Sequence, residues 1–481
     1  MAHRIIRNKW ILYRHTNNFD LVTAVAVNLK FFSKTSISRA AKKGLLLKLK
    51  DLAHYKERNP ELPLDAINHR INTLAYYMFG YKGKVAGNDR FLFSPLGNLF
   101  LKNVGNKDNL QKIFFTMLWG LQYEHPHGGS HPVFKLYPFR LIFRLLNDSR
   151  LDCTLYAFEV AYHVVFIEEI DNRKYEVLVK KILESRKWSN DKITREFKKD
   201  EHTYVNSTYE WDYYVSELFK SAGILEKIQG ETICILNHGK DTKRRLTRNS
   251  VGLNANIKSL YNKLQTEFPF TALPLPLDDP ERLKLDVIKE IYSFYPKVLL
   301  EEIGVLQDDL KIELLNLPKL IDRYSNNTEG EEAYLFENVL TKGFNQFVNV
   351  EAQRVGGAGN TDVECLYITK KRKFAVDAKS TKNKLSGINA GRLAGHRAKI
   401  GGIYTIVVTP RYVPAVLQDI KSAPIVIVRA STFSEYLYNC IDNDIREIDY
   451  ADFDKIIMKN FGTDISSKIS TLTIERFAAK S

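Results

Sequence analysis

The sequence predicts a multidomain protein with a mainly α-helical N-terminal region and a C-terminal α/β domain. Three observations support this fold class. The chain has 481 residues, and at about 100–200 residues per domain this length predicts two to four domains. Apolar residues follow helical spacing over much of the first 320 residues. From Gly330 onward, helical stretches alternate with short apolar runs that are typical of strands.

The composition is that of a globular protein, with 44% hydrophobic and 26% charged residues. These values exclude disordered, collagen-like and disulfide-scaffold proteins. The formal net charge is +15, and residues 1–50 hold 11 Lys and Arg against a single acidic residue, Asp20. This concentration of positive charge favours a polyanion such as DNA, because each neutralised phosphate releases counterions. The charge alone is equally compatible with a solvated basic surface.

The chain shows no targeting or membrane signal. No window of about 18 apolar residues exists, so we expect no membrane-spanning helix and no membrane partner. The basic N-terminus leads to no small-residue cleavage site, which argues against secretion. The four cysteines form no CxxC pair and are interpreted as thiols in a reducing compartment. We therefore expect a cytoplasmic protein.

Residues 1–150 are predicted to form a first DNA-recognition subdomain. A helical pattern over Ile67–Met78 is followed by a hairpin-like turn at Gly87–Arg90 and a short strand, Phe91–Phe93. A helix, a turn and a small β-wing are the outline of a winged-helix unit, a variant of the helix-turn-helix that reads the major groove. Arg70 and Arg90 are the candidates for DNA contact in this subdomain.

Residues 151–270 are predicted to form a second unit of the same kind. The helical pattern Tyr209–Ser221 precedes the β-branched strand Glu231–Leu236. A basic loop follows this possible wing, and its candidate DNA-binding residues are Lys243, Arg244 and Arg245. Beyond it, the proline-rich run 273–276 begins a linker and helical connector over residues 271–328.

Residues 329–481 contain the side chains that predict chemistry. An amphipathic helix over 331–347 carries Glu337, and two strand patterns place Asp362 and Asp377 fifteen residues apart. On neighbouring strands these two carboxylates would lie side by side. Carboxylate and backbone carbonyl oxygens are the ligands that Mg²⁺ prefers. The predicted magnesium ligands are Asp362, Asp377, the Ala378 carbonyl and, directly or through water, Glu337.

Lys379 completes the predicted catalytic set. Alternation along the strand puts Asp377 and Lys379 on one face, where the lysine can orient or deprotonate an attacking water. Weaker alternatives are His396 as the base and Glu364 as a further ligand. The Gly356–Gly359 segment is not followed by a GxxxxGK[ST] motif, so we interpret it as a sharp turn and not as a nucleotide-binding loop.

These residues resemble a known nuclease family. Thr361-Asp362 and Asp377-Ala378-Lys379 are similar to the motif of the PD-(D/E)xK nucleases. The wider layout resembles the Type IIS restriction endonucleases of the AlwI, MlyI and PleI group and the related nicking endonucleases. The segments that carry this wider resemblance are Asn68–Ile71, Phe91–Phe93, Leu96–Leu101, Phe114–Glu124, Pro138–Leu146 and Leu335–Asn338. That group has a glutamate at the position of Asp377 and no lysine two residues later, so this chain is nearer there to a FokI-like cleavage domain.

The resemblance implies a Type IIS restriction endonuclease. Such an enzyme recognises a short asymmetric sequence in double-stranded DNA with its N-terminal subdomains. It then hydrolyses phosphodiester bonds outside that sequence with Mg²⁺. The resemblance further implies a bacterial host with a companion DNA methyltransferase. One cleavage domain holds one active site, so a double-strand break needs a transient homodimer or a second cleavage subunit.

Two alternatives stay open at the level of sequence. A strand-specific nicking subunit would use the same chemistry without self-association. A non-enzymatic winged-helix DNA-binding protein would carry Asp362, Asp377 and Lys379 as ordinary surface residues.

Overall fold

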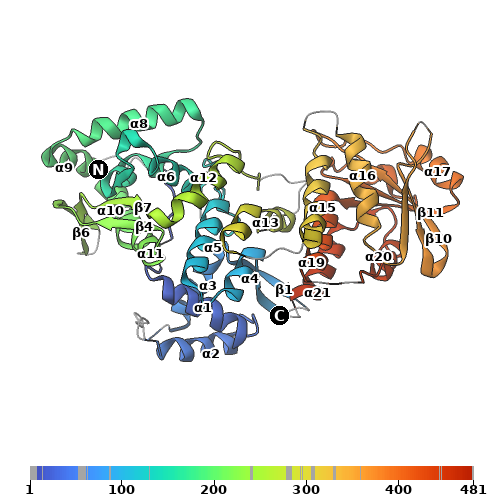
Figure 1. The fold of residues 1–481 in the computed structure, drawn as a ribbon, viewed down its shortest axis with the longest axis horizontal. Helices are drawn as coiled ribbons and strands as arrows, with labels where there is room; N and C mark the ends of the chain where they lie inside the picture. Colours follow the sequence, from blue (N-terminus) through green and yellow to red (C-terminus); the bar gives the residue numbers. More distant parts are fainter. Residues whose placement is uncertain are drawn as a thin grey trace. The chain divides into compact units, whose positions relative to one another are not determined.

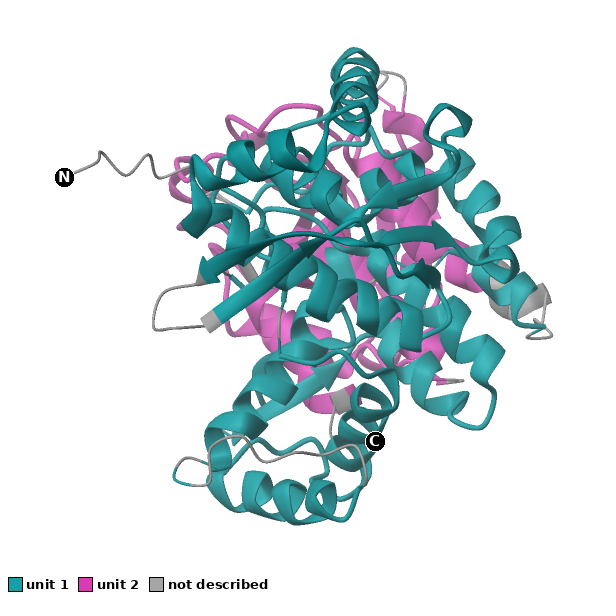
Figure 2. Ribbon diagram, turned by 90° about the vertical axis from the view of Figure 1, so that its left-hand side faces the viewer, with its two compact units in different colours: residues 1–277, 291–306 teal, residues 278–290, 307–481 magenta. Residues whose placement is uncertain are grey.

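A computed structural model gives the fold as two compact units (Figure 2). The first comprises residues 1–277 and 291–306, and the second residues 278–290 and 307–481. The residues that the structure describes are 8–13, 15–52, 61, 63–85, 88–128, 130–238, 242–277, 284–292, 294, 296–304, 309–328, 332–357, 359–443, 445 and 447–478. None of the described helices combines the length and the apolar character that a membrane span requires.

The N-terminal half of unit 1 is mainly helical. Its helices commonly begin at a side chain that accepts a backbone N–H, such as Asn18, Ser38 and Ser94. The elements are α1 (Phe19–Phe31), α2 (Arg39–Lys50), α3 (Pro63–Tyr76), the hairpin β1 (Gly80–Val85) and β2 (Asn88–Phe93), α4 (Pro95–Lys102), α5 (Lys107–Gly120) and α6 (Pro138–Leu145) (Figure 1).

The second half of unit 1 combines helices with small sheets. The helices are α7 (Ala157–Tyr162), α8 (Asn172–Arg186), α9 (Asn190–Lys198), α10 (Glu201–Glu210), a π-helical turn (Trp211–Val215), α11 (Ser216–Ser221) and α12 (Lys258–Glu267). Strands β3 (Thr154–Tyr156), β7 (Ser250–Leu253) and β4 (Leu225–Ile228) form one antiparallel sheet in that order. Between β4 and β7, strands β5 (Thr232–His238) and β6 (Thr242–Thr247) form a separate hairpin.

Aromatic rings from both halves of unit 1 pack together. The ring centroid of Phe114 on α5 lies 4.9 Å from Phe19 and 6.1 Å from Phe219. The Lys9 ammonium also lies 2.6 Å from a carboxylate oxygen of Glu210. The two predicted recognition subdomains therefore pack against each other within unit 1.

The predicted linker is divided between the units. Helices α13 (Lys284–Tyr292), α14 (Lys297–Glu302) and α15 (Asp309–Ser325) lie in this region. Residues 271–277 and 291–306 belong to unit 1, while residues 278–290 and 307–328 belong to unit 2.

Unit 2 is built on a six-stranded mixed sheet. The strand order is β13-β12-β11-β10-β9-β8. The strands are β8 (Val350–Arg354), β9 (Val363–Tyr367), β10 (Arg372–Ala378), β11 (Gly402–Thr409), β12 (Ile425–Arg429) and β13 (Thr463–Asp464). β8, β9 and β10 form an antiparallel meander, and β10 to β13 run parallel. The helices are α16 (Ala333–Phe344), α17 (Ala390–Lys399), α18 (Val416–Ile420), α19 (Ala430–Asp442), α20 (Ala451–Met458) and α21 (Ser466–Ala478).

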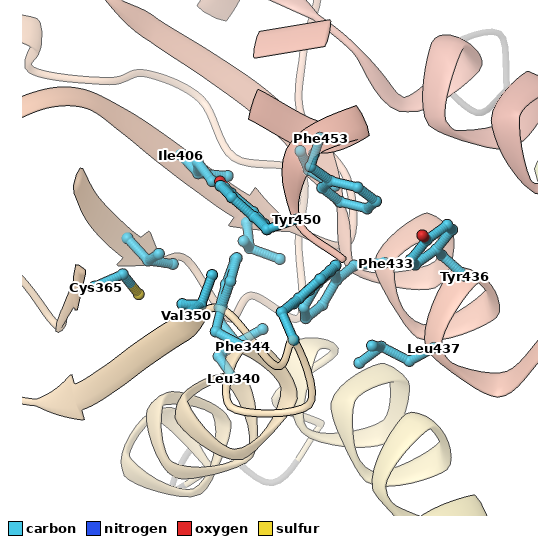
Figure 3. Close-up of a cluster of buried hydrophobic side chains, with 14 of the residues drawn as sticks. Leu340, Phe344, Val350, Cys365, Ile406, Phe433, Tyr436, Leu437, Tyr450 and Phe453 are labelled. Carbon is cyan, nitrogen blue, oxygen red and sulfur yellow. The ribbon is translucent and has the colours of Figure 1, made fainter. Parts of the chain in front are cut away.

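The central strands of this sheet are buried on both faces. On β11, Ile406 and Val408 pack into one hydrophobic cluster, whereas Val407 packs into another on the opposite face. The larger cluster joins the sheet to α15, α16, α19, α20 and α21 and contains Phe344, Phe433 and Tyr450 (Figure 3). The smaller cluster includes Leu393 of α17 and Val416 of α18. This two-sided burial explains why the sequence of β11 and β12 is continuously apolar.

Candidate active site

The register of β9 and β10 brings Asp362 beside Asp377. Val363 pairs with Val376, so the next residue outward on each strand is an aspartate. On both strands the alternate residues, such as Val363 and Val376, pack into the larger cluster. The two aspartates therefore lie on the other face of the sheet, the one that α17 covers. The proximity that the sequence predicts is present in the structure.

The electrostatics of Asp362 reflect this crowding. Its Oδ2 accepts a 2.7 Å hydrogen bond from the backbone N–H of Ala378. Burial and, to a smaller extent, the Asp377 carboxylate raise the pKa of Asp362 from 3.8 to about 6, while the Ala378 N–H and the Lys379 charge act in the opposite direction. Positive charge at this point would therefore stabilise the ionised pair.

Asp377 is the most buried member of the site, with 3% of its surface exposed. The Lys379 ammonium lies 2.5 Å from its Oδ2. That oxygen nevertheless has no hydrogen bond of acceptable geometry among the described residues. The ion pair with Lys379 therefore compensates the burial of this oxygen.

Glu337 approaches the pair from α16. Its Oε2 accepts a 2.8 Å hydrogen bond from Nε of Arg354, at the end of β8. The Arg354 guanidinium also lies over the ring of Tyr334, 4.0 Å from its centroid. The Glu337 carboxylate is close enough to contribute to the raised pKa of Asp362. Arg354 belongs to no recognisable sequence motif. Its place in the site becomes apparent only from the position of the edge strand β8.

The glycine segment before Asp362 is a tight turn, as predicted. Gly356, Gly357 and Gly359 have φ values of 58°, 85° and 80°, a region that favours glycine. A Cβ at Gly356 would lie 3.2 Å from a guanidinium nitrogen of Arg354 and 3.7 Å from Oε2 of Glu337. The turn therefore passes directly beside the Arg354–Glu337 pair.

The two weaker candidates occupy different surroundings. Burial and the Arg392 charge lower the pKa of His396 on α17, and the Asp377 carboxylate partly offsets this shift. The effect of Asp377 indicates that His396 lies near the pair of aspartates. Its Nδ1 is buried without a hydrogen-bond partner among the described residues. Glu364 lies 2.6 Å from the Lys373 ammonium and is engaged in that ion pair.

The oxygen donors of this site suit Mg²⁺ in chemistry and in number. Across the described ranges, no three His, Cys, Asp or Glu side chains gather as a metal cluster. Mg²⁺ does not need one, since it is usually held by one or two carboxylates together with water and substrate phosphate. The carboxylates of Asp362 and Asp377, which lie at the ends of neighbouring strands, and the backbone carbonyl of Ala378 fit that pattern.

The predicted DNA-binding residues lie in unit 1. The guanidinium of Arg70 donates to the His15 carbonyl, and that of Arg90 donates to the Lys34 carbonyl at 2.6 Å. On β6, Lys243 and Arg245 are exposed. The Arg244 guanidinium lies 3.9 Å from the ring centroid of Tyr209. The structure thus leaves Lys243 and Arg245 the most accessible of the five.

Comparison with known proteins places the chain in a family. Residues 5–268 match the model of the N-terminal domain of type II restriction endonuclease HgaI. The chain is also 45% identical over 479 residues to the type II restriction enzyme HgaI of Avibacterium volantium, with 97% of each chain covered. The protein belongs to the HgaI family of type II restriction endonucleases.

Structural similarity to solved proteins is weaker. Restriction endonuclease FokI matches this HgaI-family chain with 8% identity and a TM-score of 0.28, covering 95% of this chain and 99% of FokI. FokI bound to DNA gives 8% identity and a TM-score of 0.26 with the same coverage. Residues 5–268 of this chain, which match the HgaI model, fall within unit 1. The finer grouping with AlwI, MlyI and PleI stays a prediction.

Proposed function

We propose that this HgaI-family protein is a Type IIS restriction endonuclease. Unit 1 recognises a short asymmetric sequence in double-stranded DNA, and unit 2 hydrolyses phosphodiester bonds outside it. The observation that carries the proposal is the meeting of Asp362, Asp377 and Lys379 at the end of β10. The order helix, three-stranded meander, helix and parallel strand from α16 to β11 supports a PD-(D/E)xK cleavage domain.

The residues of the site have distinct tasks in this proposal. Asp362 and Asp377 hold Mg²⁺, together with the Ala378 carbonyl and with Glu337 directly or through water. When bound, Mg²⁺ lowers the pKa of water and offsets charge on the phosphate under attack. Lys379 orients the attacking water and takes part in its deprotonation. Arg354 holds Glu337 in place through their 2.8 Å hydrogen bond.

Two features of unit 1 support winged-helix character. Helix α11 is followed by β4, the β5–β6 hairpin and β7, with β7 pairing between β3 and β4. This order of strands, with a hairpin inserted between two of them, matches a helix followed by a wing. Helix α3 is likewise followed by the β1–β2 hairpin. The first of these segments lies in residues 151–270 and the second in residues 1–150, the two ranges for which we propose recognition subdomains.

The proposal includes partners besides DNA. A double-strand break requires a second active site, from a transient homodimer or a second cleavage subunit, and the host requires a DNA methyltransferase that protects the same sequence. The alternative of a nicking enzyme makes a different product. A plasmid with one recognition site gives nicked circles from a nicking enzyme and linear DNA from an enzyme that cuts both strands.

Run-off sequencing of digested DNA tests the proposal. The full chain is incubated with Mg²⁺ and DNA of the length of a phage genome. The mapped ends report the recognition site, the distance from it to each cut, and the strand that is cut. We expect one short asymmetric sequence at a fixed distance from the cuts. Asp377→Ala should abolish cleavage, while Asp452→Ala, an exposed aspartate on α20, should not. Intact DNA with the wild type, or equal cleavage by Asp377→Ala, contradicts the proposal.

A further inference from the structure

Helix α3 presents a polar face that no part of the catalytic site uses. Asp65, Asn68, His69 and Asn72 fall at i, i+3, i+4 and i+7, so they share one side of the helix. The opposite side is buried through the apolar residues Ile67, Ile71 and Leu74. Burial of that side fixes the rotation of α3, and the four polar side chains consequently face outward.

Neighbouring groups hold this face in a defined arrangement. Nε2 of His69 lies 3.4 Å from Oδ2 of Asp65, although the two side chains are 40% and 60% exposed. The His69 ring stacks on the ring of His15 with centroids 3.8 Å apart and an angle of 11° between the planes. The amide oxygen of Asn72 accepts a hydrogen bond from Lys82 on β1. Ordered polar groups of this kind are a feature of recognition surfaces.

Positive charge flanks the polar face on two sides. A groove of about 500 Å³ lies between α2 and α3. Its floor is largely apolar, with Leu46 and Leu64 among its lining residues, and its polar groups come from Arg39 and Lys43 on α2 and from Asp65 and Asn68 on α3. Beyond Asn72, burial and the nearby Lys42 ammonium lower the pKa of Lys82. Cations placed close enough to repel one another are costly for the free protein, and a polyanion would relieve that cost.

The types of side chain match what DNA displays in its major groove. Asn pairs with the N6 and N7 edge of adenine through two hydrogen bonds, and Asp accepts from the N4 amino group of cytosine. A helix fits the width of that groove. Lys and Arg beside the helix meet the phosphates that border it. Phosphate contacts position a protein, whereas contacts to base edges determine which sequence it prefers.

We propose that the polar face of α3, formed by Asp65, Asn68, His69 and Asn72, reads base edges in the major groove of the target DNA. Arg39, Lys42 and Lys43 on α2 contact the phosphates at the edge of that groove. The inference rests on the proposed function in one respect, since it takes double-stranded DNA as the substrate. It is independent of the catalytic residues and of whether one or both strands are cut.

The test measures sequence preference apart from cleavage. Full-length protein carrying Asp377→Ala is mixed with duplexes in which each position of the mapped recognition site is randomised in turn, and the bound fraction is sequenced. Asn68→Ala in this background should reduce the preference at one or two positions about tenfold, because one good base contact contributes on that order. Its affinity for random-sequence duplex should stay within about twofold.

Two further variants separate base contacts from phosphate contacts. Lys43→Gln should weaken binding to all sequences equally and reduce the slope of log affinity against log salt by about one. Asn262→Ala is the matched control, since this asparagine is also exposed on a helix of unit 1, and it should change neither quantity. Melting temperatures equal to that of the parent protein establish that the variants are folded.

The outcomes are distinct for the two proposals. If Asn68→Ala and Asn72→Ala both keep the parent's base preference, the assignment of α3 is wrong. An unchanged salt slope for Lys43→Gln overturns the placement of α2 on phosphates. If the parent protein binds every duplex equally and the wild type cuts no DNA, the proposed function itself fails, and this inference fails with it.

Discussion

The backbone N–H of Ala378 donates a 2.7 Å hydrogen bond to Oδ2 of Asp362. This bond fixes the Asp362 carboxylate against the strand that carries Asp377, although the two negative charges repel each other. The arrangement is thus held by strand pairing at a cost to the metal-free protein. A divalent cation between the carboxylates would offset this repulsion, so the pair should destabilise the metal-free protein and favour the metal-bound one.

Asp362→Asn should stabilise the metal-free protein at neutral pH. The folded-state pKa of Asp362 is raised from 3.8 to about 6, so its contribution to stability is fully present below pH 3.8 and is lost as the pH rises through 6. Two pKa units correspond to at most about 3 kcal/mol. Thermal melts in EDTA should show the full gain for the variant at pH 7.5, about half of that gain at pH 5, and little difference below pH 4.

Magnesium provides the internal check of that prediction. Added Mg²⁺ should raise the melting temperature of the wild type at pH 7.5 more than at pH 5, because protons compete for Asp362. Asp452→Asn, which alters an exposed carboxylate on α20, should behave as the wild type throughout. A gain in stability for Asp362→Asn that is the same at both pH values contradicts the pKa assignment.

Lys379→Met should remove cleavage with little effect on DNA binding. The side chain retains its length and loses the ammonium that lies 2.5 Å from Asp377. Groups that transfer or orient a proton typically contribute about 10²- to 10⁴-fold to the rate, and we expect a loss in that range under single-turnover conditions. Lys373→Met is a matched control on the same strand, since Lys373 pairs with Glu364. Comparable losses for the two lysines would exclude a specific role for Lys379.

Arg354→Met should impair the site through Glu337. Without the 2.8 Å hydrogen bond, the Glu337 carboxylate is left unpaired beside Asp362, and its position is no longer fixed. Groups that orient metal ligands typically contribute about 10- to 100-fold, so we expect a loss of that size and a changed Mg²⁺ concentration for half-maximal cleavage.

Two other variants show whether Arg354 acts by holding the Glu337 carboxylate in position. Arg354→Lys, which retains the charge, should recover part of the rate. Arg323→Met is the control, because Arg323 also lies over a tyrosine ring, that of Tyr324 at 5.8 Å. If the Mg²⁺ dependence of Arg354→Met equals that of the wild type, Arg354 does not act through the metal site.

The sequence predicted the centre of unit 2 because its strands are buried on both faces. The apolar runs of β11 and β12 are hard to interpret as anything but buried strands. On β9 and β10, the alternation of side chains between the two faces of the sheet predicts where the acidic residues lie. Asp362, Asp377 and Lys379 could therefore be brought together from the pattern alone. Their chemical roles could not, since those depend on a metal and a substrate.

The edges of the fold were not predictable in the same way. β8 has the sequence Val-Glu-Ala-Gln-Arg, with only its first residue buried, and β1 contains two glycines and two lysines and resembles a turn. The Leu155–Phe166 segment, whose apolar spacing is helical, divides into β3, α7 and a 3₁₀ turn. In these segments, contacts between residues far apart in the sequence decide the secondary structure. The Arg354–Glu337 pair, which joins an edge strand to a helix, was missed for that reason.

Asn345→Ala should loosen this edge strand. The Asn345 side chain accepts a 2.8 Å hydrogen bond from the Ala352 N–H and donates one of 2.9 Å to the Ala352 carbonyl, so it satisfies the outer edge of β8 as a further strand would. A hydrogen bond contributes about 1 kcal/mol. Loss of both should increase hydrogen exchange at Ala352 roughly five- to thirtyfold.

Mass spectrometry of deuterium uptake over β8 measures this effect in the intact protein. Asn345→Asp keeps the acceptor and loses the donor at neutral pH, so its uptake should fall between those of the wild type and Asn345→Ala. Gln346→Ala, one residue along, removes only a 3.3 Å hydrogen bond to the Lys342 carbonyl and should leave β8 protected. Because β8 also carries Arg354, faster exchange in Asn345→Ala should be accompanied by slower cleavage. Unchanged protection would mean that strand pairing with β9 alone holds the edge.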